Sequence, residues 1–224
     1  MKNLKLLMMA AMTMVCISAS AQFTNTGSGG SSDVNTSGWN SFYVQFNPSW
    51  INYDIKHVDS DSFIGLQLGY SRAFSLSPNI PLYLEVGGAL EYSFFSPDTD
   101  DDDYYYYYDD EDITDYWLSL KVPVNVVYNI QIPNSTIAIA PYAGMRLRGI
   151  LLAKEKYGDE TYDYFDKDDV GKDATWKRVQ VGAQLGTNVK FNKFFIGLGY
   201  GFDITEVAKK VKFSELSFTA GLIF

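Results

Sequence analysis

The residues best suited to catalysis stand close together in one charged segment. His57, Asp59 and Ser60 supply a base, a carboxylate and a hydroxyl nucleophile, the groups of a hydrolase or acyltransferase. A catalytic triad needs a fixed geometry, and the adjacent residues 57–60 of a charged loop do not provide it by themselves. We therefore interpret His57 as a solvated loop residue and predict that the protein is not an enzyme.

A second group of candidate ligands is acidic and rich in tyrosine. Nine Asp and Glu residues and no base lie between Asp98 and Asp112, with five consecutive tyrosines among them. Tyrosine gives binding loops a large contact area at a small cost in entropy. A recognition surface, a low-complexity decoration and weak association with a divalent cation all stay open. The predicted interaction residues are Asp101, Asp102, Asp103, Tyr104, Tyr105, Tyr106, Tyr107, Tyr108, Asp109 and Asp110.

Other metal and cofactor signals are weak. Asp166, Asp168 and Gly171 resemble part of a Ca²⁺ loop, but Val170 stands at a ligand position and no Glu follows at the required distance. The single cysteine, Cys16, lies in the N-terminal apolar segment, so the mature chain has no thiolate ligand. Phosphate loops, dinucleotide fingerprints and zinc spacings are absent from the sequence. We predict no cofactor and no metal site.

The charge balance excludes another class of function. The 224 residues hold 18 Lys and Arg against 27 Asp and Glu, which gives a formal net charge of -9. Nucleic-acid binders need clustered Lys and Arg to displace counterions, so we predict no nucleic-acid partner. The composition is 46% hydrophobic, which is too apolar for a disordered chain.

The N-terminus predicts export. Lys2 and Lys5 precede an apolar run over residues 6–17, and small residues at 19–21 offer a cleavage site. These are the three parts of a secretory signal, which is cleaved after export. We predict a signal peptide over 1–21, a flexible leader rich in Gly, Ser and Thr over 22–38, and one barrel domain over 39–224.

The rest of the chain alternates with a period of two, as β-strands do. Between Leu118 and Val126, for example, every second residue is apolar and uncharged. The same pattern predicts eight strands, at about Trp39–Tyr53, Ser62–Phe74, Pro81–Phe95, Ile113–Ile130, Thr136–Leu152, Trp176–Phe191, Phe194–Ile204 and Phe213–Phe224. Short connections alternate with long charged ones, which is typical of an outer-membrane barrel with its long loops outside and both chain ends in the periplasm.

The composition of the two strand faces favours a membrane barrel over a secreted sandwich. One face is apolar, and the other carries charges, amides and many glycines, so the apolar face is the one that suits lipid. In lipid every backbone group needs a partner, which a closed barrel provides. We therefore predict an all-β, eight-stranded, antiparallel up-and-down transmembrane β-barrel. Aromatic residues expected at its lipid interfaces are Trp50, Tyr53, Tyr92, Tyr116, Tyr128 and Trp176.

Six charged residues fall on the polar face of the predicted strands. Eight strands leave an interior just wide enough for side chains to fill. We predict that these charges pair with one another as a structural plug, and a narrow selective pore is the functional alternative. The predicted lumen charge network is Glu85, Glu91, Lys121, Arg146, Arg148 and Arg178.

Two segments resemble a known family. Residues 117–125, with an internal proline at Pro123, resemble a strand of the Bacteroidetes outer-membrane β-barrel family that includes PorT-like and OmpX-like proteins. The last ten residues, which end on the aromatic Phe224, resemble the signal by which the barrel assembly machinery recognises its substrates. The resemblance implies a barrel in the outer membrane, with outer-membrane lipid and the assembly machinery as partners.

Three functional classes follow from this reading. The leading one is a structural or surface-interaction protein whose outer loops contact an extracellular protein, glycan or cation. The resemblance alone implies the second, a PorT-like component of secretion, and a narrow channel belongs to the same transport class. A lipid-modifying enzyme is the third class, and it would require His57 to be essential.

Overall fold

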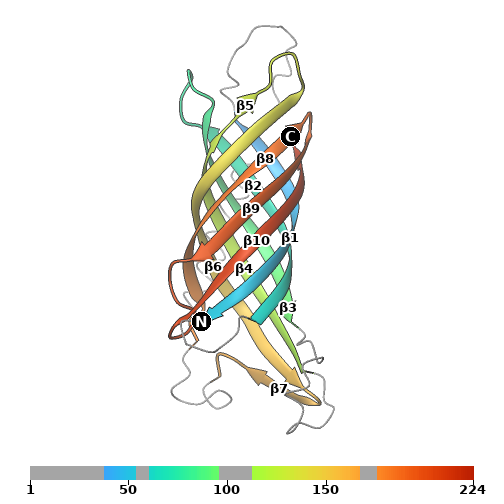
Figure 1. Cartoon of the computed structure of the whole chain (residues 1–224), viewed down its shortest axis with the longest axis vertical. Coiled ribbons are helices and arrows are strands. Elements are labelled where there is room, and N and C mark those ends of the chain that lie inside the picture. The colour runs from blue at the N-terminus through green and yellow to red at the C-terminus, as the bar shows by residue number, and fades with distance from the viewer. Residues whose placement is uncertain (1–37, 54–60, 96–112, 167–175) are drawn as a thin grey trace, which may run out of the picture. The chain divides into compact units, whose positions relative to one another are not determined.

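The computed structural model describes residues 38–53, 61–95, 113–166 and 176–224. These residues form a closed barrel of eight long antiparallel strands, as the sequence predicted (Figure 1). His57, the acidic segment 98–112 and residues 168–171 lie outside the described residues. In the described part of the chain, no helix is long and apolar enough to cross a membrane.

The strands follow one another around the barrel. Each strand pairs antiparallel with its neighbours in the order β4-β3-β2-β1-β10-β9-β8-β6, and a pairing of β4 with β6 closes the ring. The short β5 and β7 each pair with β6. The strands are β1 Trp39–Tyr53, β2 Asp61–Ser75, β3 Leu82–Phe95, β4 Ile113–Tyr128, β5 Ile130–Gln131, β6 Ile137–Tyr157, β7 Glu160–Asp163, β8 Val179–Phe191, β9 Phe194–Asp203 and β10 Val211–Ile223.

The largest error in a predicted boundary is at the end of β6, and its reason is local. β6 continues to Tyr157, five residues beyond the predicted end, and forms a hairpin with β7 inside the predicted loop 153–175. Ser119 of β4 pairs with Ile150 while Leu118 pairs with Leu152, so Leu151 is an extra residue in a β-bulge. A bulge breaks the alternation of faces, and the pattern therefore ends there although the strand continues.

The two ends of the barrel differ. At one end, called the short-turn end, lie the tight connections, among them the β8–β9 turn at Asn192 and Lys193. Asn192 adopts a positive φ of 53°, which such tight turns use and asparagine tolerates. The β6–β7 hairpin and the β9–β10 connection lie at the other end, called the long-loop end. In Figure 1 the short-turn end with β5 is at the top and β7 is at the bottom.

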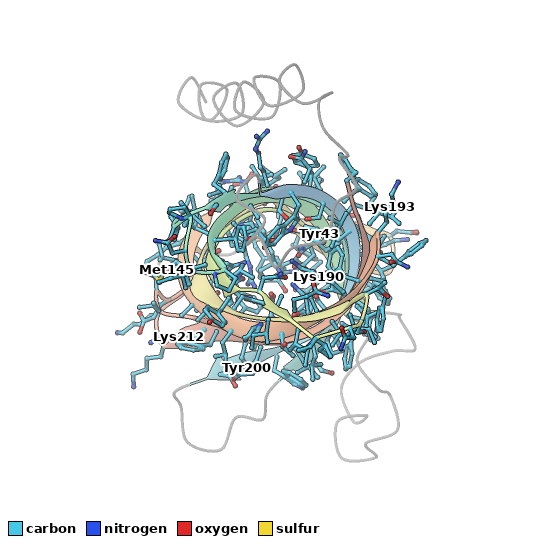
Figure 2. The ribbon with its side chains drawn as sticks, turned by 90° about the horizontal axis from the view of Figure 1, so that it is seen from above. Tyr43, Met145, Lys190, Lys193, Tyr200 and Lys212 are labelled. Atoms are coloured by element: carbon cyan, nitrogen blue, oxygen red, sulfur yellow. The ribbon has the colours of Figure 1, made fainter. Side chains whose placement is uncertain are left out.

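The two faces of each strand are divided as the alternation predicted. Figure 2 shows Tyr43 and Lys190 inside the barrel, and Met145 and Tyr200 on its outer wall. The outer wall is a continuous apolar surface, which is the expected face toward lipid. Its exposed apolar residues include Phe42, Val44, Phe46, Leu66, Leu68, Leu90, Val124, Val126, Met145, Leu185, Ile196, Leu198, Phe218 and Leu222.

Apolar side chains close the interior near both ends. The mouth cluster, at the long-loop end, consists of Ile51, Phe63, Trp117, Ile150, Ala153, Val207, Val211 and Phe213, with Tyr164, Phe165, Trp176 and Ala208 packed against it. The base cluster, toward the short-turn end, consists of Ala73, Tyr83, Val127 and Ala140, with Trp39 and Tyr142. The prediction that Trp176 faces lipid is therefore wrong. Trp176 precedes β8, so strand alternation does not set its direction, and its ring packs edge-on against Trp117.

Candidate functional site: the charge network in the lumen

The distinctive chemistry of the interior is a set of six charged side chains between the two apolar clusters. Three cations and three anions come from five strands: Glu91 from β3, Lys121 from β4, Arg146 and Arg148 from β6, Asp203 from β9 and Glu215 from β10. All six side chains are at most 9% exposed. Strand alternation directs them inward, because each lies an even number of residues from other inward-facing positions of its strand.

Glu215 is the centre of this lumen charge network. Its carboxylate lies 2.6 Å from Lys121 Nζ and 3.0 Å from Arg148 Nη2, and it also forms an ion pair with Arg146 Nη1. Asp203 pairs with both arginines, at 3.0 Å from Arg146 Nη2 and 3.4 Å from Arg148 Nη1. Three positive and three negative charges therefore balance within one buried cluster, which is what makes their burial tolerable.

Amide side chains complete the network at its edge. Lys121 Nζ donates to Glu91 at 2.6 Å, and Asn47 Nδ2 donates to the same carboxylate at 2.5 Å. Asn47 Nδ2 also lies 3.2 Å from Oε1 of Gln67, which in turn donates to Gln45 at 2.5 Å. Each added donor offsets part of the cost of removing a carboxylate from water.

Glycines make room for the guanidinium groups. A Cβ added at Gly201 would lie 2.4 Å from Arg146 Nη1, and one at Gly182 would lie 2.6 Å from the carbonyl oxygen of Phe202 and 2.9 Å from Arg146 Nε. These β8 and β9 glycines thus form the wall on which Arg146 lies. In this part of the barrel, the glycines of the polar strand face leave space for large side chains that point inward.

The structure brings four of the six sequence-predicted network residues together. Glu91, Lys121, Arg146 and Arg148 belong to the network. Glu85 does not, and Asn125 donates to it at 3.4 Å instead. A search of the strand pattern for inward-facing acids could have found Asp203 and Glu215, because both lie on the polar face of a predicted strand.

Arg178 is a correction to the predicted network. It precedes β8, is exposed, and donates to the Leu151 carbonyl at 3.1 Å. Its guanidinium carbon lies 3.9 Å from the ring centroid of Phe165, so it covers the mouth cluster. The extrapolated alternation of β8 fails here because the strand begins only at Val179.

A small polar cavity lies beside the network. Its volume is about 60 Å³, which is enough for a few water molecules. Tyr43, Glu85, Asn125, Tyr142 and Gln184 line it together with members of the network. Among the described residues, no group of three or more His, Cys, Asp and Glu side chains is placed to hold a metal ion.

The β6–β7 hairpin is fastened over the mouth cluster by Tyr164. The Tyr164 hydroxyl lies 3.0 Å from a carboxylate oxygen of Glu155 and 3.2 Å from both carboxylate oxygens of Asp115. Its ring packs against Trp117 and Trp176. Burial, followed by the charges of Asp115 and Glu155, raises the pKa of Tyr164, so the hydroxyl stays protonated and can donate.

Tyr164→Phe should loosen this hairpin. The change leaves two carboxylates without their shared donor, at a cost of about 1–3 kcal/mol. Because the folded-state pKa lies above the unfolded value near 10, the hydroxyl favours folding fully below pH of about 10 and less as the pH rises further. Protease cleavage within residues 158–166 should be faster in Tyr164→Phe, and wild-type cleavage should approach the variant's rate above pH of about 10. Equal rates at neutral pH would contradict the role of the hydroxyl.

The comparison with protein families agrees with this architecture. The family model of the outer membrane protein beta-barrel domain matches residues 7–224. Among solved structures, Ail, the attachment invasion locus protein of Yersinia pestis, is 14% identical, with 84% of this chain and 99% of that chain covered and a TM-score of 0.49. Neisserial surface protein A is also 14% identical, with 83% and 97% covered and a TM-score of 0.46.

An enzyme is also among the similar structures. The outer membrane enzyme PagL is 12% identical, with 78% of this chain and 97% of that chain covered and a TM-score of 0.39. Among curated protein sequences, none matches the chain.

The family model spans the whole barrel and most of the segment before it. The chain therefore belongs to the family of outer membrane protein β-barrel domains, and its place is the bacterial outer membrane.

Proposed function

We propose that this protein is a sealed, non-enzymatic barrel that acts as a structural and surface-interaction protein. In this proposal its outer loops contact an extracellular protein, glycan or cation. The signal peptide over 1–21 is cleaved on export, the barrel assembly machinery recognises the strand that ends at Phe224, and the long-loop end faces outward. The resemblance to PorT-like proteins of the Bacteroidetes belongs to this proposal as the suggested lineage.

One observation carries the proposal: apolar clusters and buried ion pairs occupy the lumen, with a cavity of about 60 Å³ beside the ion pairs. The lumen charge network is buried, and it lies between the apolar mouth and base clusters. An ion or solute would have to separate paired charges and displace packed aromatic rings to pass. The closed lumen favours a role at the surface of the barrel over the narrow-channel alternative, and the most distinctive remaining chemistry is in the loops.

The acidic segment 98–112 is the loop whose composition is most unusual. Its nine acids account for the whole formal net charge of -9. It connects β3, which ends at Phe95, to β4, which begins at Ile113 and pairs there with Tyr157 of the β6–β7 hairpin. Carboxylates attract a cationic partner over a distance, and tyrosines provide contact area once it arrives.

Conductance in planar lipid bilayers tests the sealed lumen. We expect the purified, folded protein to show no discrete channel openings in 1 M salt. A porin purified in the same way is the positive control and should conduct. Steady single-channel openings by the wild-type protein would overturn the sealed barrel.

A separate experiment tests the loop. Two variants of the full chain are compared with wild type, one with the tyrosines of 104–108 changed to serine and one with the acids of 98–112 changed to amides. Three probes are used: Ca²⁺, a basic protein and a glycan array. Loss of binding in both variants supports recognition, loss in the amide variant alone supports plain cation association, and no binding to any probe contradicts the interaction role.

A further inference from the structure

Four lysines gather around one ordered turn at the long-loop end. The turn joins β9 to β10 and carries Lys209 and Lys210, and Lys212 follows on β10. Lys177 is held beside it, because its backbone N–H donates to the carbonyl of Val207 at 2.7 Å. These four residues, which come from two segments of the chain, are called the basic turn.

The turn is fixed by its own hydrogen bonds and by the barrel interior. Val207 N–H donates to Val211 at 2.9 Å, and Val211 N–H donates to Ala208 at 3.0 Å. Val207 and Val211 are buried in the mouth cluster. Lys210 takes a positive φ of 63°, which completes the tight turn. The backbone that carries these lysines is therefore held in position before any ligand binds.

The four lysines form no ion pair in the part of the chain that the structure describes. All four lysines are exposed, and none of the ion pairs among the described residues includes them. Figure 2 shows Lys212 extending away from the barrel wall. Glu206 is the acidic residue of the same turn, so the lysines outnumber the acids on the described residues of this turn, within a protein of formal net charge -9.

The surface directly below the basic turn is apolar. Ile204 directly follows the end of β9, Val179 is the first residue of β8, and both are exposed. Leu198 and Phe202 continue this surface along β9, on the wall that faces lipid. A ligand that fits this surface has an anionic headgroup, which pairs with the lysines, and apolar chains, which pack against the apolar wall. A free inorganic anion would use the lysines and leave the wall unused.

We propose that the basic turn binds the phosphate-bearing headgroup of an anionic membrane lipid, whose acyl chains lie on the outer face of β8 and β9. Lysine near a membrane interface attracts anionic headgroups, and its stem lies along apolar surface while the ammonium group reaches the phosphate. This site depends on the barrel's place in the membrane and not on the proposed loop partner.

The test uses the full-length folded protein in phosphatidylcholine nanodiscs, with diphosphorylated lipid A as the probe. Binding is measured by native mass spectrometry and by titration at low and high salt. The test variant combines Lys177→Gln, Lys209→Gln, Lys210→Gln and Lys212→Gln, and the matched control is Lys193→Gln. Lys193 is an exposed lysine at the short-turn end and also points away from the barrel in Figure 2.

We expect about a fivefold loss of lipid A affinity per lysine removed, which compounds to about 600-fold for the quadruple variant. The control should bind like wild type, and a quadruple Lys→Arg variant should retain binding because it retains the charge. Heat-modifiable migration on gels shows that each variant is folded. Equal affinity of the quadruple variant and wild type would overturn the proposal. Complete displacement of lipid A by millimolar inorganic phosphate would also overturn it, because the apolar wall would then contribute nothing.

Discussion

Glu215→Gln should lower the free energy of unfolding by about 3–5 kcal/mol, the largest effect we expect from any single polar substitution in the barrel. Glu215 forms ion pairs with Lys121, Arg146 and Arg148, whereas Asp203 pairs with the two arginines. Glutamine keeps the size of the side chain but leaves three buried cations against two anions. Urea titration of the protein in lipid vesicles, followed by gel migration of folded and unfolded forms, measures the change.

A second substitution separates charge balance from packing. In Glu215→Gln with Arg146→Gln, the contacts of Lys121 with Glu91 and of Arg148 with Asp203 remain, and the buried charges are equal again. The double variant should therefore lose clearly less stability than the sum of the two single variants. Glu160→Gln, the same change on an exposed residue of β7, is the control and should stay within about 0.5 kcal/mol of wild type. Strict additivity of the two changes would show that Glu215 and Arg146 act independently.

Trp117→Ala should cost about 3–5 kcal/mol, because it removes the centre of the mouth cluster. The Trp117 ring is buried and contacts the rings of Phe63, Tyr164, Trp176 and Phe213 at centroid distances of 5.3–5.6 Å. In an eight-stranded barrel few side chains can move into the space it leaves. Urea titration gives the stability change, and protease cleavage of the β6–β7 hairpin shows whether the mouth has opened.

Trp117→Phe is the matched control for this prediction. It retains an aromatic ring at the centre of the cluster and should cost clearly less than the alanine change. Cleavage of the hairpin should increase in Trp117→Ala and remain near the wild-type rate in Trp117→Phe. A cost for Trp117→Ala below about 1 kcal/mol would mean that the mouth cluster is loosely packed and does not seal the lumen.

The sequence predicted the barrel well because its signal is local. The backbone pleat sends successive side chains to opposite faces, so any stretch of about ten residues reports which face is apolar. Eight such stretches and the alternation of short and long connections were sufficient for the strand number and the closed fold. Where this local rule is interrupted, as at the Leu151 bulge and before β8, the predicted boundary or direction is wrong.

The partners inside the lumen are not a local property. Lys121 and Glu215 are 94 residues apart in the sequence, and they meet only because the registers of all strands between them add up around a closed ring. Alternation placed Glu85 and Glu91 on the same face of β3, but the height of each in the barrel decided that Glu91 joins the network and Glu85 does not.

The sequence by itself therefore determined the fold, the lipid-facing wall and the inward direction of the lumen charges that lie within strands, since the pleat that controls them repeats every two residues. Only the tertiary structure decided which charges meet, that Glu215 holds three cations, that aromatic rings close the lumen and that Lys177 lies beside the β9–β10 turn. Strand register and barrel closure set these contacts, and both depend on all eight strands at once.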